Sequence, residues 1–230
     1  MIELLDLVLE NSYTTFYVAT LLLSIYKYRK YFDTPLKYFP ILLMYTILTE
    51  ILGSLIKYDG YNNPFASGFY SKYNLILYNV YSIISFLYFY FVYWSFSTSK
   101  KIKLMIKYCV YILICISLLN AIIYNPLHFR QNYAYTLGAI FLVYFAYLYL
   151  TKKNMLFSKN GSHKNIVYYF SIGLIVFYIG YPPIRILYFY ITEETIDIYH
   201  NLRRVHLTLI YIMYGCFIYG FIQMKKPLKF

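Results

Sequence analysis

Long apolar stretches alternate with short polar connections along the whole chain. Seven stretches are about 20 residues long, the length that an α-helix needs to cross a bilayer core of about 30 Å. They run from Leu7 to Tyr26, Leu36 to Lys57, Tyr73 to Phe96, Ile102 to Tyr124, Tyr133 to Leu150, Asn165 to Ile191 and Val205 to Gln223. The pattern predicts an all-α fold, a polytopic bundle of seven transmembrane helices. Residues 1–230 are expected to form a single transmembrane domain with no soluble domain.

The apolar positions within these stretches are continuous and do not alternate with period two. Because a bilayer core holds no water to pair with backbone groups, only helices and closed β-barrels cross it. Strands of transmembrane barrels alternate apolar and polar residues. The pattern therefore favours a helix bundle over a barrel.

Lysine and arginine residues gather in or beside every second connection. Cytoplasmic loops of membrane proteins carry an excess of these residues. Fifteen lie on one predicted side: Lys27, Arg29, Lys30, Lys37, Lys100, Lys101, Lys103, Lys107, Lys152, Lys153, Lys159, Lys164, Lys225, Lys226 and Lys229. This predicts a multi-pass protein of the cytoplasmic membrane, with the N-terminus outside and the C-terminus in the cytoplasm.

Composition agrees with a lipid environment, because 61% of the residues are apolar and only 13% are charged. A net charge of +12 would favour nucleic acid in a soluble protein, but here the basic residues fall into four clusters separated by apolar stretches. Topology and attraction to anionic lipid headgroups explain the charge. The bilayer, and not nucleic acid, is the expected partner.

The sequence lacks the motifs of familiar catalytic and metal sites. Cys109, Cys115 and Cys216 lie in apolar stretches without paired spacing, so neither a disulfide framework nor a zinc site is indicated. There is no HExxH, no GxSxG and no glycine-rich phosphate loop. We predict no catalytic residue, no metal and no cofactor from these patterns.

Charged and polar residues at depth are the candidates for function, because burying a charge in lipid costs about 2.5 to 3.5 kcal/mol. Glu50 and Arg185 are the deep charges, and both fall in the outer half of their predicted helices, where they could form an ion pair. Asn79, Asn120 and His206 fall in the same half. These five residues predict either an outward-facing polar pocket or a buried polar network that holds the helices together.

Two further features lie near this half. Gly180, Pro182 and Pro183 are expected to break or kink the sixth helix, because a proline removes a backbone hydrogen bond. His200, Arg203 and Arg204 are expected to contact an anion or a lipid headgroup. The six-residue spacing of His200 and His206 does not place both rings on one helical face, so a metal is not favoured.

Through several short motifs, the chain resembles a family of small seven-helix integral membrane proteins of the Bacteroidota. The motifs are Leu48-Thr49-Glu50, Tyr78-Asn79-Val80-Tyr81, and His206 with Tyr214 eight residues later. The resemblance covers nearly the whole chain and implies the seven-helix fold. It implies no established activity. Some members of the family lie near signalling genes, which favours a role in sensing.

These observations leave three functions open. The first is a signalling protein that responds to a small molecule or lipid in the outward pocket and acts through a separate cytoplasmic protein partner. The second is a membrane effector or channel formed by a homo-oligomer, for example in bacterial defence. The third is a lipid-active membrane enzyme in which a glutamate and a histidine share a cavity.

Overall fold

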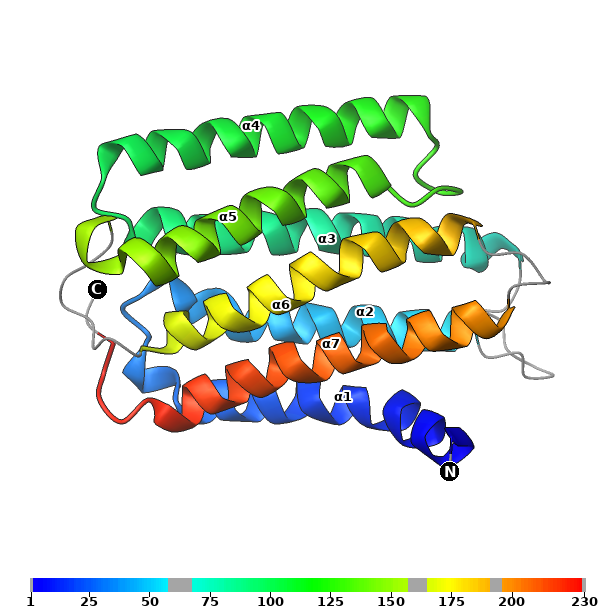
Figure 1. Cartoon of the computed structure of the whole chain (residues 1–230), viewed down its shortest axis with the longest axis horizontal. Helices are drawn as coiled ribbons and strands as arrows, with labels where there is room; N and C mark the ends of the chain where they lie inside the picture. Colours follow the sequence, from blue (N-terminus) through cyan, green and yellow to red (C-terminus); the bar gives the residue numbers. More distant parts are fainter. Residues whose placement is uncertain (1, 58–67, 157–164, 191–195, 229–230) are drawn as a thin grey trace.

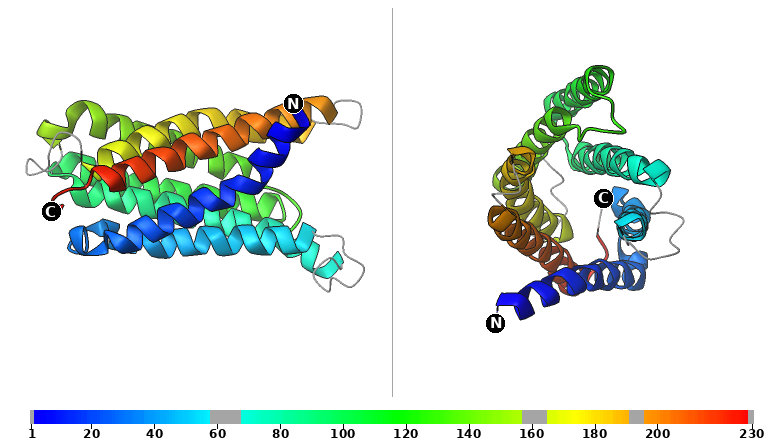
Figure 2. Two further views of the ribbon diagram at one scale, coloured as in Figure 1. Left: turned by 90° about the horizontal axis from the view of Figure 1, so that it is seen from below. Right: turned by 90° about the vertical axis from the view of Figure 1, so that its right-hand side faces the viewer.

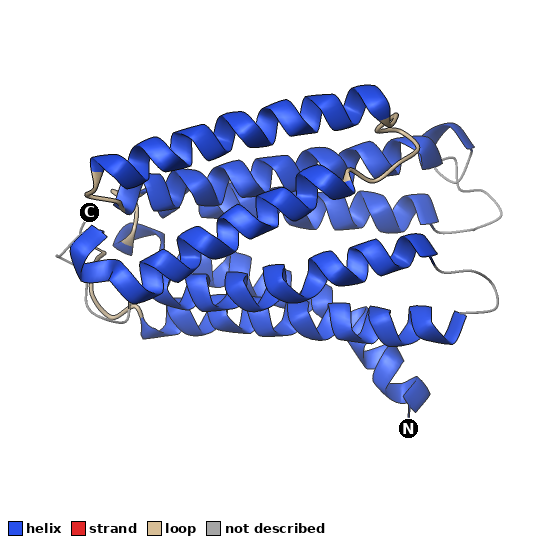
Figure 3. Cartoon of the chain, turned by 45° about the horizontal axis from the view of Figure 1, so that its top comes forward, coloured by secondary structure: helices blue, strands red, loops and turns tan. Residues whose placement is uncertain are grey.

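The computed structural model describes residues 2–57, 68–156, 165–190 and 196–228, and it is built of helices joined by short connections (Figures 1 and 3). The α-helices are α1 (Ile2–Tyr26), α2 (Phe39–Lys57), α3 (Gly68–Phe96), α4 (Lys100–Ile123), α5 (Asn132–Leu156), α6 (Ile166–Leu187) and α7 (Ile196–Gln223). Three 3-10 helices, η1 (Tyr28–Lys30), η2 (Pro35–Tyr38) and η3 (Tyr188–Tyr190), lie in the connections. The predictions of an all-α fold and of seven helices are confirmed.

Six of the helices contain segments that are long and apolar enough to cross a membrane. The segments are Pro35–Leu55, Leu75–Phe96, Lys100–Ile123, Asn132–Thr151, Ile166–Leu187 and Ile198–Gln223. The protein is therefore a polytopic membrane protein in contact with a lipid bilayer. Helix α1 has 25 residues, and its crossing of the membrane as a seventh span stays a prediction.

Six helices form a closed ring, and the seventh lies outside it. Around the ring, α1 packs on α2, α2 on α3, α3 on α5, α5 on α6, α6 on α7, and α7 on α1. Helix α4 packs on the outside of α3 and α5, as the end-on view in Figure 2 shows. Its outer face exposes large apolar side chains such as Leu118, Leu119 and Ile122, which suits contact with lipid.

The two chain ends lie at opposite ends of the bundle, which we call the N-terminal end and the C-terminal end (Figure 1). At the C-terminal end, Lys30 ties the α1–α2 connection to the segment after α7. Its Nζ donates to the carbonyl oxygens of Met224 and Lys225 over 3.1 and 2.8 Å. The Leu228 N–H donates to the Lys30 carbonyl. Two lysine-rich segments that are distant in sequence therefore form one surface.

Aromatic side chains fill the ring toward the C-terminal end. Phe170 of α6 and Phe217 of α7 have ring centroids 4.4 Å apart, and Phe39 at the start of α2 lies 4.7 Å from Phe170. Phe221 contacts the same group, and all four side chains are buried. Aromatic pairs at such distances contribute about 0.5–1.5 kcal/mol each beyond the burial of their area. This group, the aromatic plug, closes that half of the ring.

Helices α6 and α7 approach closely because glycines on α6 leave space for α7. A Cβ on Gly173 would lie 2.9 Å from the Met213 carbonyl oxygen, and a Cβ on Gly180 would lie 2.7 Å from Leu209 Cδ1. Small residues at helix interfaces let backbones come together, which is a common device in membrane bundles. Gly180 therefore has a packing role in addition to its position before the prolines.

Helix α6 continues through Pro182 and Pro183 to Leu187. The expectation that the prolines break the helix is wrong, although a bend at Gly180, Pro182 and Pro183 stays a prediction. Both prolines lie in the last two turns, and membrane helices accommodate the carbonyls that prolines leave without a donor. The expected helical stretch to Ile191 instead becomes the short helix η3 after Leu187.

Candidate functional site

The five polar residues expected to share a pocket lie toward the N-terminal end, but the structure does not bring them all together. Asn79 and Arg185 line one small cavity. Glu50 belongs to a second group with residues of α1, α3 and α7. Asn120 lies on α4, outside the ring, and His206 of α7 stacks on Tyr181 of α6. The expected single pocket is thus divided into separate polar clusters.

Among the charged residues whose burial the structure describes, Arg185 is the most buried, with 5% of its surface exposed. Its Nε donates to the Asn132 Oδ1 over 2.8 Å, and its Cζ lies 4.2 Å from the centroid of the Tyr135 ring. Both partners are on α5, at the point where that helix begins. Cation–π contact and a hydrogen bond therefore hold the guanidinium. The expected ion pair between Glu50 and Arg185 is replaced by these contacts.

Asn79 of α3 holds the connection between α4 and α5. Its Nδ2 donates to the carbonyl oxygens of Pro126 and Phe129, each over 3.1 Å. Its Oδ1 accepts from the Gln131 backbone N–H over 3.1 Å. A buried asparagine with three such bonds is satisfied by the protein itself. These bonds give Asn79 a structural role at this end of the bundle.

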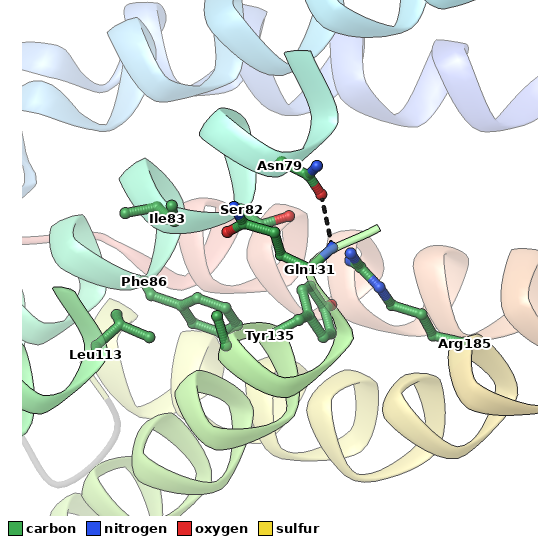
Figure 4. A pocket seen from close by; sticks show the side chains of 9 residues that line it. Asn79, Ser82, Ile83, Phe86, Leu113, Gln131, Tyr135 and Arg185 are labelled. Carbon is green, nitrogen blue, oxygen red and sulfur yellow. Dashed lines mark hydrogen bonds between the residues drawn. The ribbon is translucent and has the colours of Figure 1, made fainter. Parts of the chain in front are cut away.

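A cavity of about 10 Å³ lies between Asn79 and Arg185, with Gln131 and Tyr135 in its wall (Figure 4). The Oε1 of Gln131 is buried there without a hydrogen-bond partner among the described residues. A polar cavity of this size holds about one water molecule. A water in it could accept from Arg185 and donate to Gln131. The cavity does not have room for a larger ligand.

Glu50 lies at the centre of the second group. The Tyr78 hydroxyl of α3 donates to Glu50 Oε2 over 3.4 Å. The Tyr13 side chain of α1 interacts electrostatically with both the Glu50 carboxylate and the Arg203 guanidinium. Arg203 Cζ lies 6.0 Å from the Tyr13 ring centroid. We call Tyr13, Glu50, Tyr78 and Arg203 the charged cluster.

All four members of the charged cluster are half-buried, in contrast to Asn79 and Arg185, which are buried. Helices α1, α2, α3 and α7 each supply one member. These helices are consecutive around the ring, so the cluster lies where one side of the ring meets the N-terminal end. The cluster combines a carboxylate, a guanidinium and two phenol groups, none of them fully buried.

A row of buried hydroxyl groups continues from the charged cluster toward the middle of the bundle. One turn before Glu50 on α2, Thr46 lies with its Oγ1 2.9 Å from the Tyr81 hydroxyl of α3. On the neighbouring helices of the ring, Tyr17 of α1 and Tyr214 of α7 have ring centroids 4.5 Å apart. The same four helices that form the charged cluster therefore meet again one layer deeper.

The other predicted residues have simpler surroundings. Asn120 is buried on α4, outside the ring, and its Nδ2 has no hydrogen-bond partner within the described part of the chain. His206 of α7 stacks on Tyr181 of α6, with ring centroids 4.2 Å apart and an interplanar angle of 21°. Its Nδ1 is buried and likewise lacks a partner among described residues. Neither residue lines the cavity beside Arg185.

The residues expected to contact an anion separate into two kinds. Arg203 enters the charged cluster. His200 is exposed and contacts the edge of Tyr199, whereas Arg204 donates from Nη1 to Asn201 Oδ1 over 3.1 Å, within its own helix. Among the described residues, no group of three or more histidine, cysteine, aspartate or glutamate side chains could hold a metal ion.

Sequence reasoning missed three contributors to these clusters. Tyr13 and Asn132 follow no motif, and their roles depend on which helix faces which. For Gly53, the sequence does indicate a contact site. A small residue three positions after a deep glutamate leaves space for another side chain on the same helical face. In the structure that space is filled by the Tyr78 hydroxyl.

Comparisons with protein-family models, with curated proteins and with solved structures found no match to this chain. The resemblance to small seven-helix proteins of the Bacteroidota stays a prediction.

Proposed function

We propose that the protein is a ligand-responsive membrane protein of the signalling type, and that its charged cluster binds a small zwitterionic solute such as an amino acid. The observation that carries the proposal is the half-buried grouping of the Glu50 carboxylate, which accepts from Tyr78, with the Arg203 guanidinium, which lies over the Tyr13 ring. A solute with an ammonium and a carboxylate complements this carboxylate and this guanidinium. In the predicted orientation, the charged cluster faces the outside of the cell.

The response follows from the helices that the cluster joins. A solute that displaces Tyr13 from Glu50 and Arg203 changes the contacts of α1, α2, α3 and α7 together. The layer of Thr46, Tyr81, Tyr17 and Tyr214 lies directly below on the same four helices. A ligand shifts a protein between two states only by binding one of them better. The basic surface at the C-terminal end is where a cytoplasmic partner would detect the change.

A channel through a single chain is disfavoured by the aromatic plug. Pore lining needs polar groups along the whole path, whereas Phe39, Phe170, Phe217 and Phe221 are packed together in the ring. A channel would therefore have to form between copies in a homo-oligomer.

Thermal unfolding in lipid nanodiscs, measured with each of the twenty amino acids, tests the proposal. We expect at least one amino acid to raise the Tm in a saturable way, because a ligand that binds the folded state stabilises it. The shift should disappear in Glu50→Gln and in Arg203→Gln. Arg204→Gln is the matched control, because Arg204 bonds within its own helix. A shift that persists in Glu50→Gln, or no shift with any amino acid, would contradict the proposal.

A further inference from the structure

A groove of about 610 Å³ runs between α5 and α6 on the outside of the ring, away from the charged cluster. Its floor includes Ala139, which is almost fully buried, and its rim includes Ile140 and Ile179, each 59% exposed. Both helices contain candidate membrane spans. The open side of the groove therefore faces lipid, and its volume lies within the usual range of small-molecule sites.

The groove wall carries two carbonyl oxygens that the helix does not satisfy. Pro182 and Pro183 have no N–H to donate to the carbonyls four residues earlier, at Tyr178 and Ile179. Both prolines, Tyr178 and Ile179 all line the groove, so these acceptors belong to residues of its wall. Lipid tails offer no donor to them.

The depth of these acceptors restricts the kind of donor that reaches them. Tyr178 and Ile179 lie eight to nine residues before the end of α6 at Leu187. At 1.5 Å per residue, this places their carbonyls roughly 12 to 14 Å below the helix end. A charged headgroup is costly at such depth. A neutral hydroxyl on an otherwise apolar molecule supplies the hydrogen bond without that cost.

We infer that the groove binds one neutral membrane lipid with a free hydroxyl group, of the diacylglycerol class. The hydroxyl donates to the carbonyl of Tyr178 or Ile179, and Thr136 adds a hydroxyl to the opposite wall. One acyl chain lies along Ile140 and Val143 of α5. This site is separate from the charged cluster and does not depend on the proposed function.

Photo-crosslinking tests the site directly. The probe is a diacylglycerol with a diazirine in one acyl chain, incorporated into phosphatidylcholine nanodiscs with the full-length protein. The competitors are unlabelled diacylglycerol and the same lipid with its hydroxyl acetylated, which removes the donor. We expect crosslinks on α5 and α6 at the groove. Diacylglycerol should compete about fivefold better than the acetylated lipid, as one net hydrogen bond allows.

Two sets of variants separate the hydrogen bond from the shape of the groove. The double variant Pro182→Ala with Pro183→Ala restores both N–H groups, so it should keep the helix and lose the preference for the free hydroxyl. Ile140→Trp should block the groove and reduce crosslinking, whereas Tyr147→Trp, at an exposed position of α5 outside the groove, should not. Any one of three results would overturn the inference. These are equal competition by both lipids, a preference for the free hydroxyl that survives in the double variant, and crosslinks confined to other helices.

Discussion

The Tyr78 hydroxyl lies against Gly53, in the space that a Cβ at that position would occupy. Gly53 is on α2, one turn after Glu50, and Tyr78 reaches it from α3. The same hydroxyl donates to the Glu50 carboxylate. The absence of a side chain at position 53 thus permits a contact that holds one member of the charged cluster in place.

Replacing Gly53 with alanine should therefore displace the Tyr78 ring and weaken its bond to Glu50. Overpacking of this kind typically costs about 1–3 kcal/mol. Gly215→Ala is the matched control, because a Cβ at Gly215 has no neighbouring atom within 4 Å. That control should be neutral or more stable by up to about 1 kcal/mol. Thermal unfolding of both variants in nanodiscs measures the difference, and equal Tm values would show that Tyr78 adapts without cost.

Arg185→Lys should destabilise the protein although the charge is kept. An ammonium group cannot reproduce both the planar contact with Tyr135 and the Nε hydrogen bond to Asn132. We expect a loss of about 1–3 kcal/mol in the free energy of unfolding, as is usual for a hydrogen bond to a charged group. Equilibrium unfolding in mixed micelles measures it. The same change at Arg204, a half-buried residue, should have little effect, and similar losses at both positions would argue against a special role for Arg185.

Asn79→Ala should loosen the connection between α4 and α5. The variant removes three hydrogen bonds, to Pro126, Phe129 and Gln131, each worth about 1 kcal/mol. Hydrogen exchange of the Gln131 amide should therefore become faster, while the core amides of α6 keep their protection. Asn125→Ala is the control within the same connection, because the Asn125 side chain accepts only from the exposed Leu127 N–H. Unchanged exchange at Gln131 would contradict the role of Asn79 as a clamp.

The helices themselves could be predicted from the sequence because lipid imposes length and hydropathy on each span. The predicted ends at Lys57, Phe96 and Gln223 coincide with the ends of α2, α3 and α7. The C-terminal ends of α5 and α6 were less well predicted, because α5 continues beyond Leu150 to Leu156 and α6 ends at Leu187, before the predicted Ile191. In α6, the apolar residues after Leu187 continue the pattern, but the chain turns there into a 3-10 helix. Hydropathy cannot distinguish an apolar helix from an apolar turn that follows it.

Partners across the bundle could not be predicted, because they depend on which helix faces which. Glu50 and Arg185 have similar depths, and depth was the only coordinate that the sequence provided. In the ring, α2 packs on α1 and α3, whereas α6 packs on α5 and α7. Glu50 therefore meets Tyr13 and Tyr78, and Arg185 meets Asn132 and Tyr135. Helices with apolar residues on all faces give no signal of this neighbourhood.

The two glycines of α6 should differ in their tolerance of alanine. A Cβ at Gly173 meets the Met213 carbonyl oxygen and Cα, which are backbone atoms, whereas a Cβ at Gly180 meets the end of the Leu209 side chain. A leucine can change its rotamer, but a helix backbone moves only as a whole. Gly173→Ala should therefore lower stability by about 1–3 kcal/mol more than Gly180→Ala. Unfolding of the two variants under identical conditions checks this order, and the reverse order would refute the packing argument.

The orientation of the bundle in the membrane can be tested with single added cysteines. Lys101 lies in the first turn of α4, which begins at the C-terminal end, and His128 lies in the connection from α4 to α5 at the N-terminal end (Figure 1). Both residues are exposed. Because the lysine-rich connections lie at the C-terminal end, we expect that end to face the cytoplasm. A membrane-impermeant maleimide should label His128→Cys in spheroplasts and Lys101→Cys only in inverted vesicles. The parent protein is the control for labelling at Cys109, Cys115 and Cys216. Labelling of Lys101→Cys in spheroplasts would place the charged cluster on the cytoplasmic side and exclude an extracellular solute as its ligand.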